Sequence, residues 1–208
     1  MSLFRKSTKT DIPNGLIDLT KKAAVSLEGF YRDGSVQRLA EQTLALSANL
    51  DDDGTVPMSF FSSAVDATVD VRLDNYAGIV DREHVKCYWG GTNYAPAMTT
   101  VFRDYSLSNA TDPALVIFQT DGAPGDQAET ERVLRDLSSF PVFFAFVGFG
   151  GSIQFLERLD DLTGRRVDNA SFFHAANPRA VTDEALYDGL TSEFASWLAD
   201  ARNAGIVR

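Results

Sequence analysis

Two runs of apolar residues, 114–120 and 140–147, constrain the fold of this chain most strongly. The first reads Ala-Leu-Val-Ile-Phe-Gln-Thr and the second Phe-Pro-Val-Phe-Phe-Ala-Phe-Val. Both are far shorter than the roughly 20 residues of a membrane-spanning helix. Neither shows the strict alternation of a strand that has one face in water, so both are typical of parallel strands covered on both faces. They predict a buried sheet, and we expect no membrane span.

The rest of the chain supplies further strands and the helices to cover such a sheet. Helices are predicted over 35–50, 95–105, 126–138, 152–159 and 183–202, and strands over 56–62, 67–73 and 171–174. The last helix has the clearest apolar face, at positions 186, 190, 194, 197, 198 and 201, and Asp126 and Glu129 have the spacing of a capping box. Strands that alternate with helices predict an α/β fold, an open, mostly parallel Rossmann-like sheet with helices on both faces.

Length and charge limit the domain organisation and the class of partner. The chain has 208 residues, which favours one domain. We interpret residues 1–28, with a Pro13-Asn14-Gly15 turn signal, as an N-terminal arm or cap and 29–208 as the domain. A net charge of −10 repels phosphate backbones, so we expect no nucleic-acid partner. A single cysteine and no apolar leader at the N-terminus favour a cytoplasmic location.

Two polar loops precede predicted helices. One runs over 90–96 and contains Thr92; the other contains Asp121, directly after the strand 114–120, with Asp126 a few residues further on. Ligands of open α/β sheets gather at the carboxyl ends of the strands, so both loops are expected at that edge. A hydroxyl and a carboxylate are hard oxygen ligands, which suit Mg²⁺, Mn²⁺ or Ca²⁺.

Five motifs in a fixed order together resemble a known family. They are the segments 91–96, 120–122, 146–150 and 168–173 and the closing helix from Leu186 to Leu198. From about residue 31 to 202 the chain resembles a von Willebrand factor A (vWA) domain, and more narrowly the bacterial subfamily of tellurium-resistance and stress-response operons.

The resemblance implies a metal-ion-dependent adhesion site built from three loops. By motif position, Thr92 is the ligand of the second loop and Asp121 the carboxylate of the third. The divalent cation keeps one position open for an acidic side chain of a protein partner, in this context a TerD-like protein. Such a site binds without turnover, so the resemblance implies a binding module and not an enzyme.

This chain departs from the family pattern most clearly at the first loop. Family members have a strand that ends in Asp-x-Ser-x-Ser shortly before the segment that corresponds here to 31–37, whereas this chain passes from residues 23–28 directly through Gly29. The first central strand is therefore expected to be missing. Either the sequence omits a segment near Gly29, or the protein lacks the strand, or residues 23–27 replace it. We favour the omission, because the sheet would otherwise have a gap at its centre.

Other interpretations compete with the adhesion site. A metal-dependent hydrolase would use Asp121, Asp126 and Asp33 around one ion, and a structural interaction domain with a degenerate metal site would bind through the basic arm at 1–22 or through helix faces. Asp33-Gly34-Ser35 is more simply a turn and a helix cap, and 51–54 a solvated turn. His84 and His174 are expected to be structural, and Cys87 a passive thiol.

Overall fold

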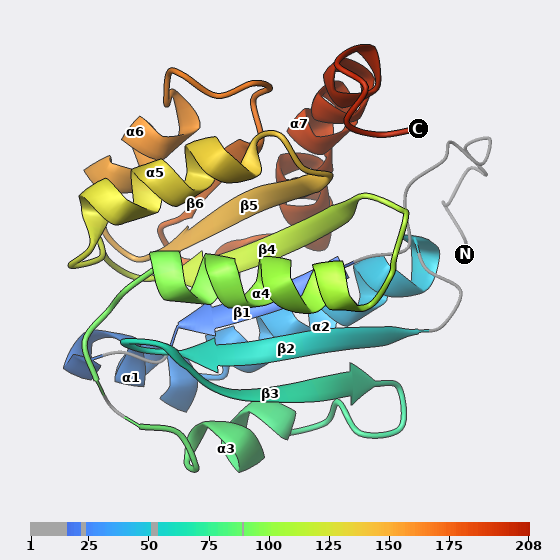
Figure 1. Ribbon diagram of the computed structural model, residues 1–208. Coiled ribbons are helices and arrows are strands. Elements are labelled where there is room, and N and C mark those ends of the chain that lie inside the picture. The colour runs from blue at the N-terminus through green and yellow to red at the C-terminus, as the bar shows by residue number, and fades with distance from the viewer. Residues whose placement is uncertain (1–15, 22–23, 51–53, 89) are drawn as a thin grey trace.

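A computed structural model describes residues 16–21, 24–50, 54–88 and 90–208 as a sheet between two layers of helices (Figure 1). The six-stranded sheet has the order β3-β2-β1-β4-β5-β6. Its strands are β1 (Leu16–Lys21), β2 (Thr55–Phe61), β3 (Val65–Arg72), β4 (Ala114–Thr120), β5 (Val142–Phe149) and β6 (Ala170–Ala175). The helices are α1 (Ala24–Arg32), α2 (Ser35–Leu50), α3 (Ile79–His84), α4 (Ala95–Leu107), α5 (Gln127–Leu137), α6 (Gln154–Asp160) and α7 (Asp183–Asn203), with a short 3₁₀ turn at Pro178–Ala180.

The predicted α/β class is confirmed, and the two apolar runs are buried strands. Every residue of β4 and β5 is buried. Along β4, Leu115 and Ile117 join the core beneath α1, α2, α3 and α7, whereas Val116 and Phe118 join the core beneath α4, α5 and α6. Because successive side chains of a strand point to opposite faces, a strand covered on both sides has no polar face, as its sequence shows.

The centre of the sheet is occupied by β1, which pairs in parallel with β2 on one side and with β4 on the other. The expectation of a missing first strand is therefore wrong. Residues 23–27 do not replace it, since α1 begins at Ala24. The predicted boundary after residue 28 also falls too late, because Leu16–Lys21 supplies the middle strand. Residues 1–15 of the predicted arm lie outside the described part of the chain.

One edge of the sheet is formed by β3, the single antiparallel strand among those described. Its polar residues alternate with apolar ones, as expected of a half-covered strand. Asn75 accepts a hydrogen bond from the Arg72 amide (2.8 Å), and its own amide donates to the Asp70 carbonyl (2.9 Å). The Asn75 side chain thus satisfies two backbone groups of β3. Groups that are already hydrogen-bonded are less available to pair with another strand.

Two predicted helix starts are confirmed by their caps. The Asp33 carboxylate accepts a bond from the Ser35 amide (2.9 Å) at the start of α2, after Gly34 with a left-handed φ of 80°. Thr182 accepts from the Ala185 amide (3.2 Å) at the start of α7. The cap predicted at 33–35 is confirmed, but the capping side chain is Asp33. The expectation that Ser35 is the N-cap is wrong, because the Ser35 hydroxyl makes no hydrogen bond with any described residue. The predicted turn at 51–54 lies, except for Gly54, outside the described residues.

Candidate functional site

The two predicted loops lie at the carboxyl edge of the sheet, to which the strands parallel to β1 all run (Figure 1). Thr92 precedes α4 and Asp121 directly follows β4, and both are half-buried. The Gly125 amide donates to the Thr92 carbonyl (2.8 Å), which joins the loop after β4 to the loop before α4. The Asn93 amide in turn donates to the Ser62 carbonyl beyond β2 (2.9 Å). The backbone thus holds three loops together at this edge.

Asp126 fixes the start of α4 from a neighbouring loop. Its two carboxylate oxygens accept hydrogen bonds from the amides of Tyr94 and Ala95, each at 3.0 Å. The Thr130 hydroxyl adds a third bond, at 3.2 Å. The first amides of a helix have no partner within the helix, and a carboxylate there also complements the helix dipole. Asp126 therefore clamps the loop of Thr92 against the loop of Asp121.

This clamp corrects one prediction about Asp126. The capping box predicted with Glu129 is wrong, because the Asp126 side chain makes no capping bond to the backbone of its own helix, α5. It serves the amides of α4 instead. The hydrolase interpretation, which includes Asp126, stays a prediction. Asp33, the other expected member, caps α2.

A buried tyrosine closes the space beneath these loops. The Tyr94 hydroxyl lies 2.9 Å from the Thr120 hydroxyl and also donates to the Gly122 carbonyl. Burial raises the pKa of Tyr94 above its usual range, and the hydrogen bond with Thr120 opposes this only in part. The ring packs among Phe118, Phe146 and Phe155. Tyr94 therefore remains a neutral phenol that ties α4 to the end of β4.

The histidines and the cysteine have structural surroundings, as predicted. His84 stacks on Tyr31 with ring centroids 4.6 Å apart, and its Nδ1 lies 2.9 Å from the Val80 carbonyl. His174 Nε2 lies 2.8 Å from the Gly150 carbonyl. Cys87 is buried. None of these contacts aligns a nucleophile with a base.

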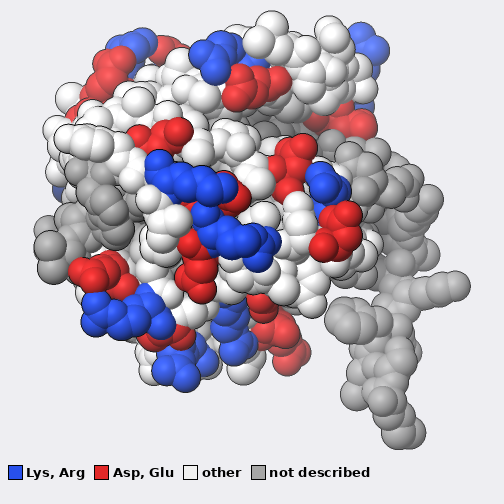
Figure 2. All heavy atoms as spheres, turned by 90° about the horizontal axis from the view of Figure 1, so that it is seen from below, with Lys and Arg blue, Asp and Glu red and all other residues white. Residues whose placement is uncertain are grey.

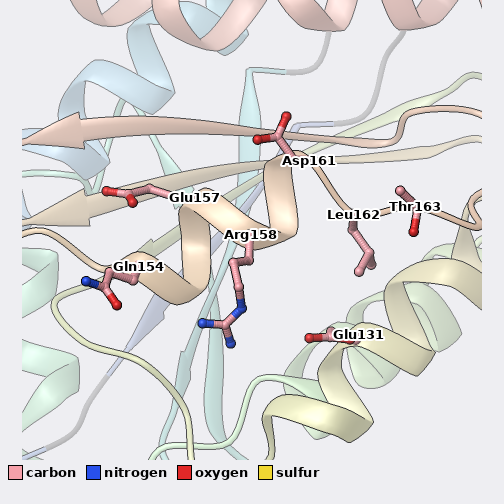
Figure 3. A pocket seen from close by; sticks show the side chains of 7 residues that line it. All are labelled: Glu131, Gln154, Glu157, Arg158, Asp161, Leu162 and Thr163. Carbon is pink, nitrogen blue, oxygen red and sulfur yellow. The ribbon is translucent and has the colours of Figure 1, made fainter.

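A shallow groove of about 580 Å³ lies between α5 and α6. It is lined by Glu131, Gln154, Glu157, Arg158, Asp161, Leu162 and Thr163 (Figure 3). Arg158 donates to the Gln127 side chain (2.9 Å) and lies over the Phe155 ring, and Glu157 accepts from Ser152 (2.8 Å). Two of its polar side chains thus serve internal contacts, and the lining holds no His, Cys or Ser.

The family follows from the chain as a whole. A model of vWA-TerF-like domains, described as the vWA found in the TerF C terminus, matches residues 17–207. The chain belongs to this vWA family. Its match begins within β1, in agreement with a sheet that includes this strand.

Known proteins similar to this vWA domain differ in length and in origin. The uncharacterized protein YcbR of Bacillus subtilis (strain 168) is 33% identical over 211 residues, 98% of this chain and 84% of YcbR. The von Willebrand factor type A structure from Catenulispora acidiphila has a TM-score of 0.60 at 13% identity, over 86% of this chain and 42% of that chain. Manganese-loaded Plasmodium vivax TRAP has a TM-score of 0.55 at 20% identity, over 81% and 72%.

These structural likenesses show the vWA fold. The mussel byssus protein PTMP1 has a TM-score of 0.57 at 17% identity, over 79% of this chain and 44% of PTMP1. The vWA domain thus spans less than half the length of the first solved structures that it matches. Within the described segments, each helix is too short or too polar to cross a bilayer.

The vWA resemblance implies a cation whose first ligands follow the central strand. In this chain the corresponding sequence is Asp18-Leu19-Thr20-Lys21-Lys22, which sequence reasoning missed because the segment was assigned to an arm. Asp18 is paired with Ile117, three residues before β4 ends. At about 3.3 Å per residue this lies roughly 10 Å back from the edge. Thr20, two residues further along β1, is paired with Gln119.

These positions do not fit the ligand set of a resident divalent ion. Two carboxylates that share an ion each lie about 2.0–2.6 Å from it, and the register sets Asp18 well back from Asp121. Among residues 16–21, 24–50, 54–88 and 90–208, no three His, Cys, Asp or Glu residues gather as a metal site. Joint ligation by Thr92 and Asp121 stays a prediction.

Proposed function

We propose that this vWA domain is a protein-binding module that receives an acidic group of its partner at the carboxyl edge of the sheet, between the loops of Thr92 and Asp121. The observation that carries this proposal is the Asp126 clamp, which joins these loops to the start of α4. A surface fixed by internal bonds loses little conformational freedom when a partner binds. The clamp thus prepares this edge for contact with a partner.

Binding without turnover is supported by the residues around this edge. The hydroxyl of Thr120 is bonded to Tyr94, and the two histidines contact backbone carbonyls elsewhere. A hydrolase needs a base aligned with the group that it activates. No observation favours that reaction, and we propose a binding protein in its place.

The degenerate form of the adhesion site fits the register of β1 better than an intact one. Thr92 and Asp121 supply oxygen donors of the kind that Mg²⁺, Mn²⁺ and Ca²⁺ prefer, and one structural neighbour is manganese-loaded. The first-loop acid is not at the edge, however. Isothermal titration of the wild-type chain with the three cations, beside Asp121→Ala, tests this point. Equal heats for both proteins support a degenerate site, whereas tight binding lost in Asp121→Ala restores the intact one.

The biological setting is proposed from the family alone. The description of the family refers to TerF, which suggests a cytoplasmic role in tellurium resistance or stress response with a TerD-like partner. On the face seen from below in Figure 2, the coloured acidic and basic side chains are interspersed, as on a solvated surface. Size-exclusion chromatography of this chain with a purified TerD-like protein tests the partner. We expect co-elution in the presence of EDTA, weakened by Asp126→Ala.

A further inference from the structure

Two stretches of the chain without any charged residue meet at the carboxyl edge of the sheet. Residues 54–65, which include β2, and residues 87–102, which lead into α4, contain no Asp, Glu, Lys, Arg or His. The Asn93 amide donates to the Ser62 carbonyl (2.9 Å), which joins the second stretch to the end of the first. In a chain of which 23% of the residues are charged, this contact brings together two neutral segments at one place.

Four exposed residues beside this contact make up a surface that we call the neutral patch: Ser63, Ala64, Tyr88 and Gly91. Its one large side chain is Tyr88, which is 73% exposed. The ring lies against the backbone of the loop, because a Cβ at Gly90 would be 3.2 Å from Tyr88 Cδ1 and 3.0 Å from Ser63 Oγ. The Gly91 amide donates to the same hydroxyl (3.1 Å). Tyr88 is therefore open to solvent and rests on a backbone that hydrogen bonds hold in place.

The composition of the neutral patch is that of the buried centre of a protein interface. Charged residues are depleted there and tyrosine is enriched. A tyrosine offers a large ring for contact and loses little conformational freedom when it is covered. The net charge of −10 also repels an acidic partner over the surface as a whole. An acidic partner therefore approaches this protein most readily where the surface is neutral.

We propose that the neutral patch binds an apolar side chain of the partner, next to the acidic group that the loops of Thr92 and Asp121 receive. This inference rests on the proposed function and names the chemistry of the partner: a segment in which an apolar residue, such as leucine, flanks an acidic one. Gly91 directly precedes Thr92, so one extended segment can contact both. The Tyr88 ring supplies apolar area for this contact, and removal of such area from water favours association.

The test is an NMR titration of the ¹⁵N-labelled full chain with short synthetic peptides, a measurement that detects weak binding residue by residue. Three peptides are compared: a glutamate flanked by leucines, a glutamate flanked by serines, and a glutamine flanked by leucines. The proteins are the wild type, Tyr88→Ser and Tyr88→Phe. The matched control is Leu73→Ser, because Leu73 is 69% exposed and follows the end of β3, which pairs with the start of β2 at the opposite edge. Circular dichroism checks the fold of each variant.

We expect the wild type to bind the glutamate–leucine peptide about tenfold more tightly than the glutamate–serine peptide, with the largest shifts at the amides of the neutral patch. Tyr88→Ser removes this preference for leucine. Tyr88→Phe, which retains the ring, keeps the affinity within about threefold of the wild type. Leu73→Ser leaves the preference unchanged.

Other outcomes separate the inference from the proposed function. Equal binding of the two glutamate peptides overturns the neutral patch while the acidic edge stands, as does a leucine preference that Tyr88→Ser leaves intact or that Leu73→Ser weakens equally. A leucine preference that is lost in Tyr88→Ser but is as strong for the glutamine peptide supports the neutral patch and overturns the acidic edge. Absence of binding of all three peptides overturns both.

Discussion

Removal of the Asp126 carboxylate should loosen the candidate site and lower the stability of the whole domain. Asp126→Ala deprives the amides of Tyr94 and Ala95 of their acceptor, and both residues are buried. Loss of a side-chain cap costs about 0.5–2 kcal/mol, and a hydrogen bond to a charged group contributes about 1.5–3 kcal/mol. Because Asp126 is partly exposed and its bonds are not additive, we expect a loss of about 2.5 kcal/mol in the free energy of unfolding.

Two measurements report this loss on different scales. In a thermal melt, about 2–4 °C per kcal/mol for a chain of this size gives a decrease of roughly 8 °C in Tm. Hydrogen exchange reports the same clamp locally. If local opening costs about 2 kcal/mol less in the variant, the amides of Tyr94 and Ala95 exchange about 30-fold faster.

A matched carboxylate on the neighbouring helix gives the control. Asp136 on α5 pairs with Arg132 at 2.7 Å, and its side chain is 59% exposed. Surface ion pairs of this kind contribute about 0–1 kcal/mol, so Asp136→Ala should lower Tm by less than about 3 °C. If Asp126→Ala lowers Tm no more than Asp136→Ala does, or if exchange at residues 94 and 95 is unchanged, the Asp126 carboxylate does not stabilise the start of α4.

Three further predictions concern the core and the far end of the sheet. Tyr94→Phe leaves the Thr120 hydroxyl and the Gly122 carbonyl without its phenol and should cost about 1–2 kcal/mol in urea unfolding; no shift in the midpoint would argue against this bond. Burial raises the pKa of Asp160 to about 6, from 3.8, so the folded protein holds an extra proton between these values. This group therefore lowers stability progressively as pH rises from about 4 to 6, and the loss is complete above 6. Asp160→Asn should remove this loss, about 1 kcal/mol after solvent screening, so that the variant gains more stability over the wild type in unfolding curves at pH 7.5 than at pH 4.5. Gly189→Ala should destabilise α7 by about 1–3 kcal/mol despite the better helix propensity of alanine, because a Cβ there meets the Phe173 ring; a higher Tm would contradict this packing.

The strands with a purely apolar sequence were predictable, because burial on both faces leaves one pattern. The segment 114–120 forms β4 as predicted, and β5 begins at Val142, just after the proline. The central strand was not predictable from its own residues. Leu16–Lys21 mixes polar and apolar side chains within six residues and lies beside basic residues, as an arm would. Its place is decided by pairing with β2 and β4, which lie far away in sequence.

The candidate site also has one part that the sequence could predict and one part that it could not. Asp121 could be placed at this edge because the end of β4 is visible in the apolar pattern, and Thr92 because its loop precedes a predicted helix. The sequence assigned Asp126 to a capping box within its own helix, since local spacing shows only local partners. In the structure, that carboxylate accepts hydrogen bonds from amides at the start of α4, about 30 residues earlier in the sequence. Such a long-range contact has no signature in the spacing of nearby residues.

The position of β1 also has a consequence for synthesis on the ribosome. This strand ends at Lys21 and is made about 100 residues before its neighbour β4 is complete, at Thr120. At about 5–20 residues per second, the strand waits roughly 5–20 seconds for that partner to leave the ribosome. Throughout this interval the nascent chain carries an unpaired strand edge that chaperones or other nascent chains can contact. Translation speed between the two strands therefore becomes a determinant of folding yield.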